Sequence, residues 1–225
     1  MILQNCVIIG NVFTREVAKS PSLVLWLSHG PPFDLVDVKG ILLTRTAQEE
    51  NGCTLDSISH SAEQTQRLGM RLGELLTGGE LILLEGQLGT GKTTFTQGLA
   101  VGLDITANIN SPTFTLLKEY PGQARAGKPG EAARVGPPLY HFDLYRLDDA
   151  AEIFDLGFDD YFYGTGVCIV EWAERADLYW PTDHLRIRLK TLSETKRGLL
   201  FIATGARYCE LLRQFQKITY VTPGS

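Results

Sequence analysis

Three features that mark common protein classes are missing from this sequence. No apolar run approaches the roughly 20 residues that span a bilayer, and the first 13 residues have neither the basic segment nor the cleavage site of a signal peptide, so we expect none. Basic residues are not in excess: 21 Lys and Arg stand against 26 Asp and Glu, a formal net charge of −5. Because a broad nucleic-acid-binding surface neutralises phosphates with Lys and Arg, we expect a cytoplasmic chain that meets RNA only through a partner or a local patch.

Cysteine is also scarce. The chain has four, Cys6, Cys53, Cys168 and Cys209, with no C-x-x-C pair and no nearby histidine at metal-ligand spacing. This scatter predicts reduced thiols in place of a disulfide framework or a zinc site. Cys168 lies inside an apolar run and is predicted to be a small buried hydrophobe.

The chain divides into segments of different character. Its 44% hydrophobic and 21% charged residues fit one α/β domain with an appendage. Residues 1–52 hold short apolar runs that Gly and Pro interrupt, without helical periodicity, which predicts a poorly ordered extension. The α/β domain is predicted over residues 53–218, with a tail over 219–225. Within the domain, the Gly-, Pro- and Ala-rich residues 121–138 are typical of an exposed loop.

Apolar periodicity predicts the elements of this domain. A helix over 62–77 has Ser61 as its cap and leucines on one face, and a second helix covers 93–103. The continuous apolar run 81–84 is typical of a strand buried on both faces of a sheet. The other expected elements are strands over 54–58, 113–119, 139–143, 167–171, 185–189 and 199–204, and a helix over 206–216. This order predicts a three-layer α/β sandwich with a mainly parallel central sheet of about seven strands.

A phosphate-binding pattern joins the first buried strand to the second helix. Residues 86–93 read Gly-Gln-Leu-Gly-Thr-Gly-Lys-Thr and fit G-x-x-x-x-G-K-[ST], the P-loop pattern, in full. The glycines allow successive backbone N–H groups to point at phosphates, where the helix N-terminus adds positive potential. Lys92 is predicted to reach the β- and γ-phosphates, Thr93 to ligate Mg²⁺ and Thr94 to approach the α-phosphate.

Two later strands end in carboxylates that suit the same site. A P-loop enzyme needs a second, acidic anchor for its metal on a neighbouring buried strand, and Glu171 ends the apolar run 167–171. Asp143 ends another strand and is predicted to orient the attacking water or a metal-bound water. The role of Arg146 stays open, since it could form a structural ion pair with an acid. His141 is more often a packed or hydrogen-bonded histidine than a metal ligand, and it is predicted as such.

A possible switch segment precedes these strands. In Ser-Pro-Thr-Phe, residues 111–114, a rigid Ser-Pro turn would deliver the hydroxyl of Thr113 toward the γ-phosphate. An ordinary loop before a strand fits the same spacing, so both interpretations stay open.

Taken in order and spacing, these segments resemble the TsaE family over residues 53–217. Walker-type loops occur in many families, whereas HFDLYR together with IVEW is highly specific. The resemblance is carried by five segments: GQLGTGKTTFTQGL (86–99), SPTFTLLKEY (111–120), YHFDLYRL (140–147), Gly157-Phe158 with Tyr161-Phe162, and VCIVEWAER (167–175). Residues 1–52 and the long loop 121–138 depart from the family pattern without removing a motif residue.

The resemblance implies a Mg²⁺-dependent ATPase that acts with the TsaB–TsaD pair in threonylcarbamoyl transfer to adenosine of tRNAs reading ANN codons, meeting tRNA only through that complex. It implies nucleotide binding by Ser61, Gly86, Gly89, Thr90, Gly91, Lys92, Thr93, Thr94 and Lys196. It implies Mg²⁺ binding by Thr93 and Glu171, and catalysis by Lys92, Thr113, Asp143 and Glu171.

Three rival interpretations remain open at this point. A small-molecule P-loop kinase would need an arginine-bearing lid, for which residues 174–199 offer no clear candidate. A GTPase would need the guanine-reading N/T-K-x-D sequence, which is absent because Thr195-Lys196 is followed by Arg197-Gly198. A nucleotide-gated scaffold would bind ATP without hydrolysis, so turnover in the presence of TsaB and TsaD separates it from an ATPase.

Overall fold

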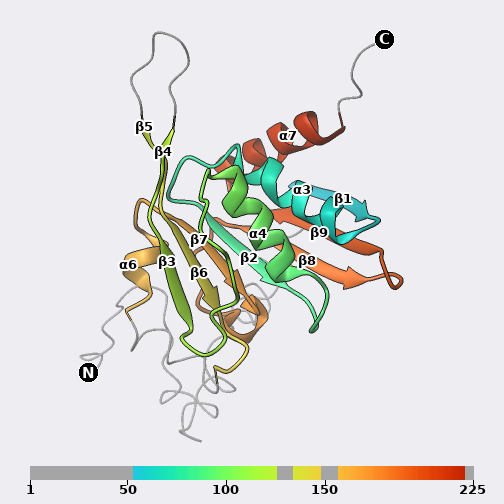
Figure 1. Cartoon of the computed structure of the whole chain (residues 1–225), viewed down its shortest axis with the longest axis horizontal. Coiled ribbons are helices and arrows are strands. Elements are labelled where there is room, and N and C mark those ends of the chain that lie inside the picture. Colours follow the sequence, from blue (N-terminus) through green and yellow to red (C-terminus); the bar gives the residue numbers. More distant parts are fainter. Residues whose placement is uncertain (1–52, 126–133, 148–156, 221–225) are drawn as a thin grey trace, which may run out of the picture. The chain divides into compact units, whose positions relative to one another are not determined.

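The apolar strands of the sequence assemble into one seven-stranded sheet, in a computed structural model that describes residues 53–125, 134–147 and 157–220. The predicted N-terminal extension, the centre of the 121–138 loop and residues 221–225 lie outside these ranges. Figure 1 shows the strands side by side, from β3 on the left to β1 on the right. In that order they are β3 (Leu117–Tyr120), β6 (Leu139–Asp143), β7 (Val167–Glu171), β2 (Leu81–Glu85), β8 (Leu185–Thr191), β9 (Arg197–Ala203) and β1 (Cys53–Ser59).

Most strands of the sheet run in one direction. The central strands β6, β7, β2 and β8 pair in parallel, while β9 is antiparallel to both β8 and β1. β1 therefore points the same way as the central four, and only β9 and β3 run against them. Every residue of β2 and β7 is buried, as expected of parallel strands covered on both faces. The predicted mainly parallel sheet of seven strands is confirmed.

Helices cover both faces of this sheet. On one face α3 (Ala62–Gly73), α4 (Lys92–Gly102) and α7 (Ala206–Tyr220) pack through a core that includes Leu72, Phe95 and Phe215. On the other face lie the short helix α6 (Asp159–Phe162) and the 3₁₀ helix η2 (Ala173–Ala176). These faces confirm the three-layer α/β sandwich. Among the described residues, no helix is both long enough and apolar enough to cross a membrane.

Glycines allow α3 and α4 to approach each other backbone to backbone. Each helix presents two of them one turn apart: Gly69 and Gly73 on α3, Gly98 and Gly102 on α4. A Cβ atom on Gly98 would lie only 2.7 Å from the carbonyl carbon of Gln66, and one on Gly69 only 2.9 Å from the backbone nitrogen of Leu99. We call this contact the glycine seam. It fixes the start of α3 beside the loop that opens α4.

Several element boundaries differ from the predictions. The helix predicted to reach residue 77 ends at Gly73, and the last helix continues to Tyr220, two residues into the predicted tail. The strand predicted over 113–119 begins only at Leu117, because the residues before it form a turn in which the Leu116 N–H donates to Pro112 O over 2.7 Å. At the two ends of the 121–138 loop, β4 (Ala124–Arg125) pairs with β5 (Arg134–Val135).

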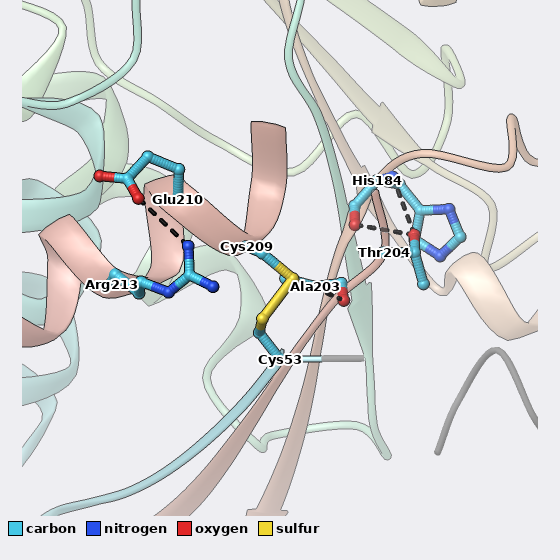
Figure 2. Close-up of a disulfide and its surroundings, with 7 residues drawn as sticks. All are labelled: Cys53, His184, Ala203, Thr204, Cys209, Glu210 and Arg213. Atoms are coloured by element: carbon cyan, nitrogen blue, oxygen red, sulfur yellow. Dashed lines mark hydrogen bonds and ion pairs between the residues drawn. A yellow bond between two sulfur atoms is a disulfide. The ribbon is translucent and has the colours of Figure 1, made fainter. Parts of the chain in front are cut away.

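The prediction of reduced thiols is wrong for two cysteines. Cys53, at the start of β1, and Cys209, in the first turn of α7, form a disulfide with their Cα atoms 5.3 Å apart (Figure 2). Their separation of 156 residues left no local signal of the pairing. Cys168 is a buried free thiol, as predicted, and burial raises its pKa to about 12.

Candidate nucleotide-binding site

The loop between β2 and α4 has a backbone that only glycine adopts readily. Gly86, Gly89 and Gly91 have positive φ angles of 140°, 78° and 99°. Gly86 is also tightly packed, since a Cβ atom there would meet the backbone of Leu189. The N-cap of α4 is Gly91 and carries no side-chain hydrogen bond, so the first N–H groups of this helix are open to an anionic ligand. The loop therefore has the backbone shape expected of the predicted phosphate-binding loop.

Lys92, the first residue of α4, folds back over this loop. Its Nζ donates to Gly86 O at 2.5 Å and to Gln87 O at 3.1 Å, and it lies 3.7 Å from the ring centroid of Trp172. Burial lowers the pKa of the Lys92 ammonium, and nearby carboxylates, Glu171 first, oppose that shift. The ammonium is thus held over the loop where phosphates would lie.

The two predicted acids emerge together at one edge of the sheet. Asp143 of β6 and Glu171 of β7 are register partners in a parallel pair, so both carboxylates leave the C-terminal ends of their strands side by side. Glu171 is 2% exposed, and its Oε2 accepts a hydrogen bond from Thr93 Oγ1 over 2.9 Å. Since hydroxyl and carboxylate oxygens are the ligands that Mg²⁺ prefers, this pair suits the predicted metal role.

Asp143 is held by the segment predicted to act as a switch. Its Oδ2 accepts hydrogen bonds from Thr113 Oγ1, at 2.7 Å, and from Ser111 Oγ, while its Oδ1 accepts one from the Tyr145 N–H at 2.9 Å. Of the two interpretations left open for residues 111–114, the structure favours the one that brings Thr113 to the site.

A cavity of about 380 Å³ joins these groups. It is lined by Leu88, Gly89, Gly91, Lys92, Thr93, Thr94, Ser111, Thr113, Asp143, Tyr145, Glu171 and Trp172. Every residue predicted to be catalytic or to bind the metal is among them. No group of three or more His, Cys, Asp or Glu side chains within the described ranges could hold a metal ion. A Mg²⁺ ion held by one carboxylate, one hydroxyl, phosphate oxygens and water is consistent with this set, since Mg²⁺ usually keeps several waters.

A second cavity of about 330 Å³ shares Gly89, Gly91 and Thr94 with the first. The predicted Ser61 lines it, and its Oγ accepts the Gln64 N–H as the N-cap of α3. Lys196 does not line this cavity, whereas its neighbours Thr195 and Arg197 do. Arg197 also donates from Nη2 to Gly89 O at 3.4 Å. The late loop thus reaches this cavity through Arg197, and the cavity continues the phosphate site toward the start of α3.

Two neighbours of the acids were not predicted as site residues. His141 lies two positions before Asp143 on β6, hence on the same face of the sheet, and its Nε2 is 2.9 Å from Glu171 Oε1. That spacing was the available signal. Trp172 follows Glu171 in a left-handed conformation, with φ of 61°, and its ring lies 4.9 Å from that of Tyr145. No sequence pattern indicates that conformation.

The sheet, the glycine loop opening α4 and the acids at the neighbouring strand ends define an α/β protein of the P-loop NTPase type. The particular family follows from sequence: residues 59–199 match the model for the threonylcarbamoyl adenosine biosynthesis protein TsaE. This chain belongs to the TsaE family.

Individual relatives agree with this assignment. The chain is 41% identical over 160 residues to the tRNA threonylcarbamoyladenosine biosynthesis protein TsaE of Bacillus subtilis, covering 70% of this chain and 92% of that protein. It is 41% identical over 142 residues to the protein of the same name from Treponema pallidum, covering 63% and 96%. Among solved structures, Bacillus subtilis YdiB is similar with a TM-score of 0.60 and 34% identity, covering 74% of this chain and 97% of that one.

Proposed function

We propose that this chain is a Mg²⁺-dependent ATPase that serves tRNA threonylcarbamoyladenosine biosynthesis together with a TsaB–TsaD pair. One observation carries the proposal: a glycine-shaped phosphate cradle, a hydroxyl–carboxylate pair and an oriented aspartate line a single cavity. Membership of the TsaE family supports the biosynthetic role.

Each group of residues in the cavity would have a separate role in phosphoryl transfer from ATP to water. The loop N–H groups and Lys92 would bind the β- and γ-phosphates, so that Lys92 leaves its two carbonyl partners when ATP enters. Thr93 and Glu171 would hold Mg²⁺, which neutralises charge on the phosphate oxygens when bound. Lys92 and the N-terminus of α4 would stabilise the charge that develops during transfer.

Asp143 is suited to orient the attacking water. An ionised carboxylate offers about four acceptor positions, and three are taken by Ser111, Thr113 and the Tyr145 N–H. The remaining position, on Oδ1, can accept a hydrogen bond from a water in the cavity that Asp143 lines. The three donors fix the plane of the carboxylate, so that a water bound there is aligned with little loss of freedom.

The nucleoside of ATP would bind in the second cavity, which adjoins the phosphate site. It lies between the start of α3 and the β8–β9 connection, and Ser61, Thr195 and Arg197 offer polar groups there. The absence of a guanine-reading sequence after Thr195 favours adenine.

The test is ATP hydrolysis by the purified protein, alone and with TsaB and TsaD from the same organism. We expect stimulation by the pair and its loss in Lys92→Ala and Glu171→Ala, whereas Lys217→Ala, an exposed lysine on α7, should behave as the wild type. ATP binding without turnover in the complete mixture would favour a nucleotide-gated scaffold. A rate of ATP hydrolysis that TsaB and TsaD do not change would contradict the role in the pathway and favour the kinase interpretation.

A further inference from the structure

His141 is a fully buried polar residue on β6, in register with Lys118 of β3 on one side. It is 0% exposed on β6, two residues after buried Leu139 and in register with buried Ile169 of β7. Its Nε2 lies 2.9 Å from Glu171 Oε1, while its Nδ1 has no hydrogen-bond partner among the residues that the structure describes. Packing alone would be served better by an apolar side chain, because a buried polar atom without a partner is destabilising.

The hydrogen bond to Glu171 indicates which ring nitrogen of His141 carries a hydrogen. A carboxylate oxygen only accepts, so Nε2 carries the hydrogen of the contact with Glu171. The ring is therefore expected to carry a hydrogen on Nε2, whatever Nδ1 carries.

The carboxylate of Glu171 is held from two sides. Its Oε2 accepts from Thr93 Oγ1 of α4 at 2.9 Å, and its Oε1 faces His141 of β6. Thr96 Oγ1 reaches the same Oε1 only at 3.5 Å, the long limit of a hydrogen bond. With both oxygens engaged, the carboxylate cannot rotate without breaking a contact to one element or the other.

We propose that His141 is a positioning residue: it fixes the rotation of the Glu171 carboxylate so that Oε2 is presented to Thr93 and to the Mg²⁺ ion that accompanies ATP. This inference rests on the proposed function, since it concerns the metal-binding pair of that site. Groups that orient metal ligands in this way commonly change metal affinity or activity by about 10- to 100-fold when removed.

The test compares His141→Leu, which has similar bulk and no donor, with His141→Gln, whose amide can donate near the same point. The readouts are calorimetric binding of a non-hydrolysable ATP analogue with and without Mg²⁺, and the Mg²⁺ concentration for half-maximal hydrolysis. For His141→Leu we expect the Mg²⁺ requirement to rise by about 10- to 100-fold, with Mg²⁺-free analogue binding unchanged. His141→Gln should recover most of the loss, which a role in packing alone would not predict.

Failure of the inference is distinguishable from failure of the proposed function. If Glu171→Ala weakens the Mg²⁺-dependent part of analogue binding and His141→Leu does not, His141 has no positioning role while the ATPase site stands. If wild-type protein binds no Mg²⁺–nucleotide, the proposed function itself falls, and this inference falls with it.

A spectroscopic measurement covers the case in which His141→Leu does not fold. Long-range ¹H–¹⁵N spectra of the wild type should show a histidine ring with Nε2 protonated, identified as the ring whose signals are missing in His141→Gln. A ring with no hydrogen on Nε2 would overturn the inference, because it could not donate to Glu171.

Discussion

Replacing Gly98 by Ala is a direct test of the glycine seam. Gly98 has ordinary helical geometry, so alanine suits its backbone. What alanine lacks is space: a Cβ atom would lie 2.7 Å from the carbonyl carbon of Gln66 and 3.0 Å from its Cα. Both atoms belong to the backbone of α3, which cannot turn aside as a side chain can. The two helices must therefore move apart.

The expected size of the effect follows from two opposing terms. Alanine in place of glycine inside a helix is favourable by about 1 kcal/mol. Overpacking a tight contact costs about 1–3 kcal/mol, and more where backbone must move. The atoms that Gly98 would meet are backbone, so we place the cost at about 3 kcal/mol, which leaves a net loss in the free energy of unfolding of about 2 kcal/mol.

Urea unfolding of wild type, Gly98→Ala and Val101→Ala measures this difference. Val101 lies on α4 and is 51% exposed, so its change to alanine should stay within about 0.5 kcal/mol of the wild type. A Gly98→Ala protein more stable than the wild type by about 1 kcal/mol, the helix-propensity gain alone, would refute backbone contact between α3 and α4. Weaker ATP binding should accompany the destabilisation, since the seam holds Ser61 beside the phosphate loop.

Three further predictions concern single side chains. Cys53→Ser should lower the free energy of unfolding by about 2–5 kcal/mol, because the disulfide to Cys209 closes a long loop. If adding reductant did not change the melting temperature of the wild type, this prediction would be contradicted. Asp143→Asn should keep ATP affinity near that of the wild type but reduce hydrolysis by about 100-fold or more, measured by single-turnover kinetics; normal turnover would exclude Asp143 from water orientation. Burial raises the pKa of Cys168 to about 12, so at pH 8 the thiolate needed for reaction is scarcely populated. In a Cys6→Ser variant, a thiol reagent at that pH should therefore label Cys168 only after unfolding, and rapid labelling of the folded protein would count against its burial.

The phosphate cradle could be predicted from sequence because it is local. Residues 86–93 are contiguous, and the φ angles of Gly86, Gly89 and Gly91 are those that favour glycine. The apolar strand before them and the helix after them confirmed the context. Nothing from distant parts of the chain was needed to interpret the motif.

The two acids could be predicted from a rule about sheets. Parallel strands present their C-terminal ends at one edge, so acids that end two such strands are candidates to meet. The register of β6 and β7 then placed Asp143 beside Glu171. The turn that brings Thr113 to Asp143 could only be weighed as one of two options, since its shape depends on hydrogen bonds to residues about 30 positions away.

Features that depend on long-range packing were not predicted. Gly98 sits inside an ordinary helical pattern, and its role appears only when α3 lies against it. The Cys53–Cys209 pair had no signal, because the return of α7 to β1 is a property of the tertiary fold. In the β8–β9 connection Lys196 is exposed while the next residue, Arg197, lines a cavity, a difference that the sequence alone does not show.

The disulfide between β1 and α7 also closes a large covalent ring in the polypeptide. Residues 53 to 209 form a closed ring, and the whole proposed site, from Ser61 to Arg197, lies on it. A protease that cuts one peptide bond anywhere inside that ring opens it without separating the pieces: one band is expected on a non-reducing gel and two on a reducing gel. Because the two pieces stay tethered at high effective concentration, a singly nicked protein should be able to keep the phosphate loop and the two acids together until a reductant releases them.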